Sequence, residues 1–159
     1  MSLHALIALA QRAIATLEAA QPLAQLAARL YLAQVFFLSG LSKLRNWDST
    51  LALFEDEYHV PLLSPQWAAV AGTAGELVLP VLLALGLAGR FAAAGLSVIN
   101  VVAVLSLVEI AAPALQQHVF WGSLLIGLLL WGPGRWSLDR VLLPHLRGSA
   151  PGAGYTRAA

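Results

Sequence analysis

Four long apolar stretches dominate the pattern of hydrophobic and polar positions along the chain. They lie at residues 23–43, 67–87, 91–112 and 113–132. At about 1.5 Å per residue, a helix of this length can cross a hydrocarbon core about 30 Å thick. The pattern therefore predicts an all-α fold, an integral membrane four-helix bundle that occupies residues 23–132.

Shorter amphipathic runs flank and interrupt these stretches. Residues 1–22 predict an interfacial helix that ends at Pro22, because proline removes a backbone donor and clashes with the preceding turn. A cleaved signal peptide fits less well, since Arg12 falls inside the apolar run rather than before it. Residues 44–66 predict a short extracytoplasmic helix that covers the bundle. Residues 133–147 predict a second interfacial segment and residues 148–159 a disordered tail.

The composition agrees with a membrane protein and excludes several kinds of chemistry. Of 159 residues, 59% are hydrophobic and 11% are charged, an apolar excess that a soluble domain of this size does not need. The net charge of +1 gives no indication of nucleic-acid binding. The absence of cysteine excludes disulfides, thiolate-ligated metals and cysteine-ligated iron–sulfur clusters within the chain. Any electron transfer therefore needs a bound cofactor or a partner protein.

The basic residues predict an orientation in the membrane. If both termini lie on one side, that side carries Arg12, Arg29, Arg90, Arg135, Arg140, Arg147 and Arg157. The opposite side then holds only Lys43 and Arg45, beside a loop with four acidic residues. Because arginine and lysine favour cytoplasmic segments, we expect both termini to be cytoplasmic and residues 44–66 to lie outside.

Glu76 is the ionisable residue that most needs an explanation. It lies about 13 Å along the second span from Trp67, near the middle of the bilayer, where an unpaired carboxylate is very costly. Lys43 is expected to lean toward it, because helical side chains point toward the N-terminus of their helix. Ala68, Gly72 and Glu76 share a face that admits another helix.

Two interpretations of Lys43 and Glu76 remain open. In the first, the pair joins Ser39 and Asn100 and fixes the packing and register of the helices. In the second, Glu76 is a catalytic group that exchanges a proton with a bound quinone or solute, while Lys43 stabilises its charged form. Both interpretations fit the sequence, which also leaves open whether the chain is an enzyme.

No metal centre is predicted, although a weak alternative lies outside the membrane. The third span is expected to reach Glu109 and the next turn to bring it near His118, with His59 on the outer loop. Imidazole and carboxylate suit a divalent cation, but the spacing matches no metal motif, and solvated loop charges are the simpler interpretation. Haem is disfavoured, because all four histidines fall at or outside the membrane edges.

Several motifs together resemble the DoxX family of small bacterial four-helix membrane proteins. They are RLYLAQVFFLSGLSKLRNW, FEDEYHVPLL, TAGELVLPVLLALGLAGRFAA and GPGRWSLD, within residues 29–142. The ordered combination of G-x-x-K, Y-x-V-P, G-E-L-x-x-P and G-R is fairly specific, whereas each motif alone is weak. The recurrent positions of the family correspond to Arg29, Lys43, Tyr58, Pro61, Glu76, Pro80 and Arg90. The family has no single agreed chemistry, and these positions carry no established catalytic role.

The resemblance implies a location in the bacterial inner membrane and a link to redox chemistry. Such proteins are associated with quinone-linked thiosulfate oxidation, with membrane oxidoreductase complexes and with operons for copper-related modified peptides. We therefore expect a quinone-associated or accessory subunit of a membrane redox system, acting with partner redox proteins or as a homo-oligomer in the lipid bilayer. A transporter or export component for a solute, metal or peptide, and a non-catalytic scaffold, remain the alternatives.

The candidate quinone or solute pocket is assembled from polar residues in or beside the spans. They are Arg29, Ser39, Tyr58, Arg90 and Asn100. Phe36, Phe37 and Trp121 either stack on a quinone ring or simply pack against other helices.

Overall fold

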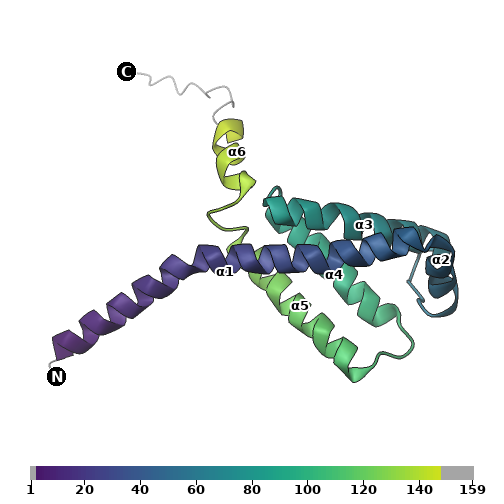
Figure 1. Cartoon of the computed structure of the whole chain (residues 1–159), viewed down its shortest axis with the longest axis horizontal. Coiled ribbons are helices and arrows are strands. Elements are labelled where there is room, and N and C mark those ends of the chain that lie inside the picture. Colours follow the sequence, from purple (N-terminus) through teal and green to yellow (C-terminus); the bar gives the residue numbers. More distant parts are fainter. Residues whose placement is uncertain (1–2, 148–159) are drawn as a thin grey trace, which may run out of the picture.

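The structure is a computed structural model that describes residues 3–147, and most of that part of the chain is helical. The helices are α1 (Leu3–Arg45), α2 (Trp47–Asp56), α3 (Pro65–Leu85), α4 (Gly89–Ser106), α5 (Ala112–Trp131) and α6 (Leu138–Arg147), as Figure 1 shows. Four of them, α1, α3, α4 and α5, are long and apolar enough to cross a membrane. The predicted all-α membrane bundle is confirmed, while the predicted disordered tail lies outside the described residues.

The four long helices pack in chain order. α1 lies along α3, α3 contacts α4 and α4 contacts α5, while α5 also touches α1 (Figure 1). Leu32, Leu83, Leu96 and Leu125 are completely buried between these helices. Many other large apolar side chains point outward, and Val98, for example, is 62% exposed. An exterior of this kind suits contact with lipid, because the bilayer core solvates apolar groups and not polar ones.

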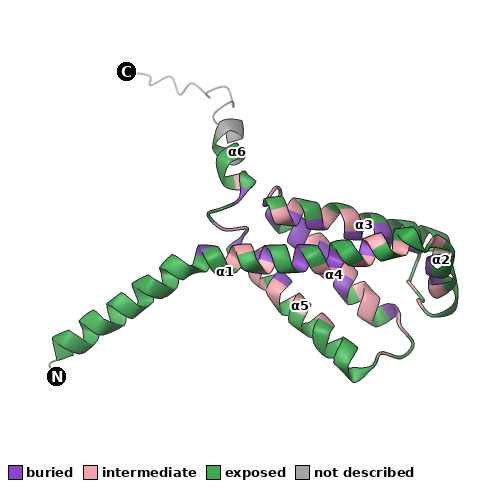
Figure 2. Ribbon diagram, viewed as in Figure 1, coloured by how far each residue is buried: buried purple, intermediate pink, exposed green. Residues whose placement is uncertain are grey.

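α1 differs from the prediction in its N-terminal half. One helix runs from Leu3 to Arg45 through Pro22, so the predicted end at Pro22 is wrong. Figure 1 shows α1 bending where it leaves the bundle, and Figure 2 shows that residues 3–21 are exposed. Proline bends long helices without always ending them, and it is tolerated where neighbouring segments satisfy the freed backbone groups.

α4 is also shorter than predicted. It ends at Ser106, so Glu109 lies in the loop before α5 and not on a helix. The backbone N–H of His59 donates to the carbonyl of Ser106 at 2.9 Å, and Tyr58 forms an isolated antiparallel bridge with Leu107. The loop after α2 therefore crosses to the end of α4 and takes up a carbonyl that a longer helix would have used.

The short helix predicted between the first two spans is confirmed as α2. Phe54 packs against Ala68 and Ala69, in the first turns of α3. At the other end of α2, the hydroxyl of Thr50 donates to the backbone carbonyl of Lys43 at 3.0 Å. α2 thus covers the region where α1 ends and holds the last turn of α1 against α3.

Candidate functional site

Lys43 and Glu76 form a direct ion pair between α1 and α3. The Lys43 ammonium donates to both carboxylate oxygens of Glu76, at 2.7 and 2.5 Å, and to the Ser39 hydroxyl at 3.1 Å. All three ammonium hydrogens therefore have acceptors. The side chains of Lys43 and Glu76 are only 19% and 9% exposed. The predicted meeting of the two residues is confirmed, and Ser39 is part of the same cluster.

A glycine that the sequence analysis missed brings the two helices this close. A Cβ atom added to Gly40 would lie 2.9 Å from the Cβ of Glu76 and 3.1 Å from its backbone carbonyl carbon. Only hydrogen fits there, so Gly40 sets the α1–α3 distance at the ion pair. Gly72, on the face predicted to admit another helix, lies beside α2, and a Cβ atom added to it would lie 3.6 Å from the Phe54 ring. Gly40 stands three residues before Lys43, in G-x-x-K, and that spacing was the available signal.

The ion pair lies in the wall of an apolar cavity of about 430 Å³ between α3, α4 and the loop after α2. Its lining consists of Lys43, Phe54, Tyr58, Val60, Pro61, Leu63, Ala68, Ala71, Gly72, Glu76, Val98, Ile99, Val102 and Ala103. Among these residues only Lys43 and Glu76 are charged. We call this space the ion-pair cavity. Its edge includes the largely exposed Val98, so it reaches the surface that a bilayer would surround.

Tyr58 adds a neutral hydroxyl group to the ion-pair cavity. Its ring stacks on Phe54, with centroids 5.1 Å apart and an interplanar angle of 25°. Burial raises the pKa of the Tyr58 phenol above its ordinary value, and the negative charges of Glu76 and Glu57 raise it further. The phenol is therefore protonated at neutral pH and can donate a hydrogen bond. Its hydroxyl has no hydrogen-bond partner within residues 3–147.

Asn100 lies in a different polar cluster, between α4 and α5. Its amide nitrogen donates to the backbone carbonyl of His118 at 2.9 Å, and its amide oxygen lies 2.8 Å from Nδ1 of the same residue. Because that oxygen only accepts, Nδ1 of His118 carries the proton. The Trp121 ring packs edge-on against the His118 ring, and its Nε1 donates to the hydroxyl of Tyr31 at 3.1 Å. Asn100 thus joins α5 to α4, in place of the predicted contact with the ion pair.

The residues of the weak metal-site alternative and the aromatic residues do not join the ion pair in one site. Within the described part of the chain, no three His, Asp or Glu side chains are grouped so as to hold a metal ion. His59, Glu109 and His118 therefore form no such cluster. Phe36 and Trp121 pack edge-to-face at 5.9 Å, while Phe37 is exposed on the outer surface.

Arg29 holds together the opposite end of the bundle. It is 1% exposed, and its guanidinium donates four hydrogen bonds to backbone carbonyls. The acceptors are Leu83 at 2.9 Å, Ala84 at 2.6 Å, Pro133 at 2.7 Å and Trp136 at 2.9 Å. Arg29 precedes Lys43 by about 21 Å along α1. Arg90, at the start of α4, also lies at this end and donates to Leu130 at 3.2 Å.

The residues of the predicted pocket are therefore not all brought together. Tyr58 lines the ion-pair cavity and Ser39 contacts Lys43, but Arg29 and Arg90 lie at the other end of the bundle. Asp139 also has a role that was not predicted from the sequence: its two carboxylate oxygens accept from the backbone N–H groups of Ala88 and Gly89, at 2.7 and 2.8 Å. Asp139 caps the N-terminus of α4, which explains the aspartate in the GPGRWSLD motif.

A known protein family matches this chain. The DoxX family profile matches residues 24–109, which is more than half of the chain. The matched region contains α2, α3 and α4, the part of α1 that lies in the bundle, and both members of the ion pair. No curated protein and no solved structure matches the sequence. With its four spanning helices, the chain is a multi-pass integral membrane protein, and it belongs to the DoxX family.

Proposed function

We propose that the ion-pair cavity binds the headgroup of a quinone or quinol, and that Glu76 exchanges a proton with it. The chain would then be the quinone-binding subunit of a membrane redox system. One observation carries this proposal: the cavity is apolar and open toward the lipid, and its only charged lining residues are a hydrogen-bonded lysine and carboxylate. A buried ionisable pair in a membrane span is by default a candidate functional site.

The dimensions and chemistry of the cavity suit a lipophilic headgroup with polar oxygens. Its volume of about 430 Å³ lies within the range of ordinary small-molecule sites, roughly 300–1,000 Å³. The walls from Ile99, Val102 and Ala103 suit the ring of a quinone, and the exposed Val98 marks where a molecule enters from the bilayer. The Tyr58 hydroxyl can donate to a quinone oxygen, and the Lys43 ammonium can do so once Glu76 has taken up a proton.

Oxidation of a quinol releases two electrons and two protons. The Glu76 carboxylate accepts one proton from a quinol hydroxyl, and the resulting neutral acid leaves Lys43 free to donate to the quinone oxygen that forms. The second proton leaves toward the water beside the loop after α2. Both electrons pass to a partner redox protein, because this chain has no cysteine with which to hold an iron–sulfur cluster. Reduction of a quinone follows the same steps in reverse.

The orientation that fits this proposal places the ion-pair cavity in the outer half of a bacterial inner membrane. Arg29, Arg90, Arg135 and Arg140 belong to one end of the bundle, and arginine-rich ends favour the cytoplasm. A cysteine introduced at Ser49 should therefore react with an impermeant reagent added to intact cells. Labelling only after the cells are broken would show that the protein has the opposite orientation in the membrane.

Quinone retention tests the proposal. The protein is extracted in mild detergent, incubated with ubiquinone and analysed by native mass spectrometry. We expect wild type to retain ubiquinone and Ala103→Trp, which fills the ion-pair cavity, to lose it. Val81→Trp is the matched control, because Val81 is an exposed residue of α3 outside this cavity. Equal retention by all three proteins, or none by wild type, would refute quinone binding here.

A further inference from the structure

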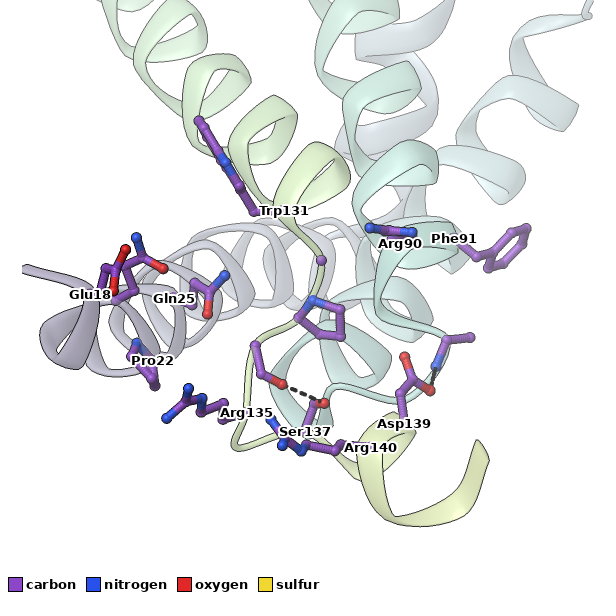
Figure 3. Close-up of a pocket in the computed structure, with 15 residues that line it drawn as sticks. Glu18, Pro22, Gln25, Arg90, Phe91, Trp131, Arg135, Ser137, Asp139 and Arg140 are labelled. Atoms are coloured by element: carbon purple, nitrogen blue, oxygen red, sulfur yellow. Dashed lines mark hydrogen bonds between the residues drawn. The ribbon is translucent and has the colours of Figure 1, made fainter. Parts of the chain in front are cut away.

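A second cavity lies at the Arg29 end of the bundle, where four segments of the chain meet. Its volume is about 820 Å³. Figure 3 shows Pro22 and Gln25 of α1 on one side, Trp131 of α5 and Arg90 of α4 on another, and the segment leading into α6 below. We call this space the basic cavity.

The basic cavity carries an excess of positive charge, because its lining has more arginines than acidic residues. Arg135 and Arg140 line it, and neither guanidinium group has a hydrogen-bond or ion-pair partner in the described part of the chain. Arg90 has a single acceptor, the carbonyl of Leu130. Of the two acids in the lining, Asp139 uses both oxygens to cap α4, and Glu18 lies across the cavity on α1 (Figure 3). The guanidinium groups are therefore available to an anion.

An apolar groove continues from the basic cavity toward the middle of the bundle. It has a volume of about 410 Å³ and runs between α1 and α5. Gln21, Gln25 and Trp131 line both spaces. The remaining lining of the groove is Ala24, Ala28, Ser123, Leu124, Gly127 and Leu128. From Trp131 to Ser123 the groove follows α5 for about 12 Å.

From this continuity we infer that the basic cavity and the groove form one binding site for an anionic phospholipid. The phosphate of the headgroup lies against Arg135 and Arg140, and an acyl chain lies in the α1–α5 groove. α4 begins and α5 ends at the cavity, so it stands at the level where a bilayer presents its headgroups. Guanidinium groups match phosphate oxygens in geometry and charge, and tryptophan favours the membrane interface. A free phosphate ion would use the arginines but not the groove.

Lipid binding by native mass spectrometry tests this inference. The protein is mixed with phosphatidylglycerol or phosphatidylethanolamine of identical acyl chains, and bound lipid is counted. We expect wild type to prefer phosphatidylglycerol. Arg135→Gln with Arg140→Gln should weaken phosphatidylglycerol binding by about twenty-five-fold, since each arginine near a membrane surface contributes about fivefold. The matched control is Arg12→Gln with Arg45→Gln, two exposed arginines outside the cavity, which should leave the preference intact.

The groove is tested by Gly127→Leu. A Cβ added there would lie 3.2 Å from the Trp131 ring, so a leucine side chain fills the groove. It should lower the binding of both lipids without changing the preference between them. A wild type without preference, or a double glutamine variant that keeps it, would overturn the inference. If inorganic phosphate displaces phosphatidylglycerol while Gly127→Leu has no effect, the cavity binds a soluble anion instead of a lipid. Since Arg135 and Arg140 are far from Glu76, quinone retention should be unchanged in their variant.

Discussion

Lys43 and Glu76 should be energetically coupled across α1 and α3. The perturbation is a cycle of four proteins: wild type, Lys43→Met, Glu76→Leu and the double variant. In each single variant one charge remains without the partner that wild type holds at 2.5–2.7 Å. Breaking a buried pair in this way typically costs about 3–5 kcal/mol, whereas replacing both members by apolar residues is often nearly neutral.

The structure sharpens this range for Lys43→Met. The remaining carboxylate is only 9% exposed, so water solvates it poorly. The loss of stability in Lys43→Met should therefore lie near the upper end of this range, at about 5 kcal/mol.

Titration with sodium dodecyl sulfate from a mild detergent, followed by tryptophan fluorescence, gives the free energy of unfolding of each protein. Arg45→Met is the matched control, because it removes an exposed cation from the same turn of α1 and should change stability little. The average interhelical hydrogen bond in a membrane protein contributes about 0.6 kcal/mol. A coupling energy no larger than that, with additive losses in the double variant, would refute the reasoning.

Three further predictions concern packing and pH. Gly40→Ala should lower stability by about 1–3 kcal/mol through the clash with Glu76, whereas Gly72→Ala, with its nearest contact at 3.6 Å, should be nearly neutral in the same titration. Arg29→Gln should lower the free energy of unfolding by more than about 3 kcal/mol, because charged hydrogen bonds to four backbone carbonyls are lost. A loss below about 1 kcal/mol would show that these hydrogen bonds do not hold this end of the bundle together. Because the folded state holds the pKa of Tyr58 above its ordinary 10.0, the stability that this residue contributes is complete below that pH and is lost as pH rises through the raised value. Tyr58→Phe should abolish this loss. If the unfolding of wild type and of Tyr58→Phe depends on pH in the same way, the pKa of the Tyr58 phenol is not raised in the folded state.

The four spans, the short helix and the ion pair were predictable from the sequence for physical reasons. The bilayer demands long apolar helices, so the hydrophobic pattern alone locates them. The same medium makes a single buried carboxylate very costly, so Glu76 needs a partner, and Lys43 is the cation whose side chain leans toward it.

The features that the sequence did not predict depend on contacts between distant segments. α4 ends at Ser106 because His59, from the loop after α2, takes up its carbonyl. The acceptors of Arg29 lie more than fifty residues away along the chain. No local sequence pattern therefore distinguishes an arginine that binds backbone carbonyls from one that binds a ligand. Pro22 permits either a break or a bend, and α1 continues through it toward an exposed N-terminal segment.

The role of Glu76 is tested most directly by redox-induced infrared difference spectroscopy of the protein with bound ubiquinone. An electrode reduces and reoxidises the quinone while the carboxyl stretching region is recorded. Proton exchange predicts a band of a protonated carboxyl group that appears when the quinol is oxidised, that is absent in Glu76→Gln and that remains in Glu55→Gln, an exposed glutamate of α2. A band of equal intensity in Glu76→Gln, or no carboxyl band in wild type with quinone bound, would contradict proton exchange at Glu76.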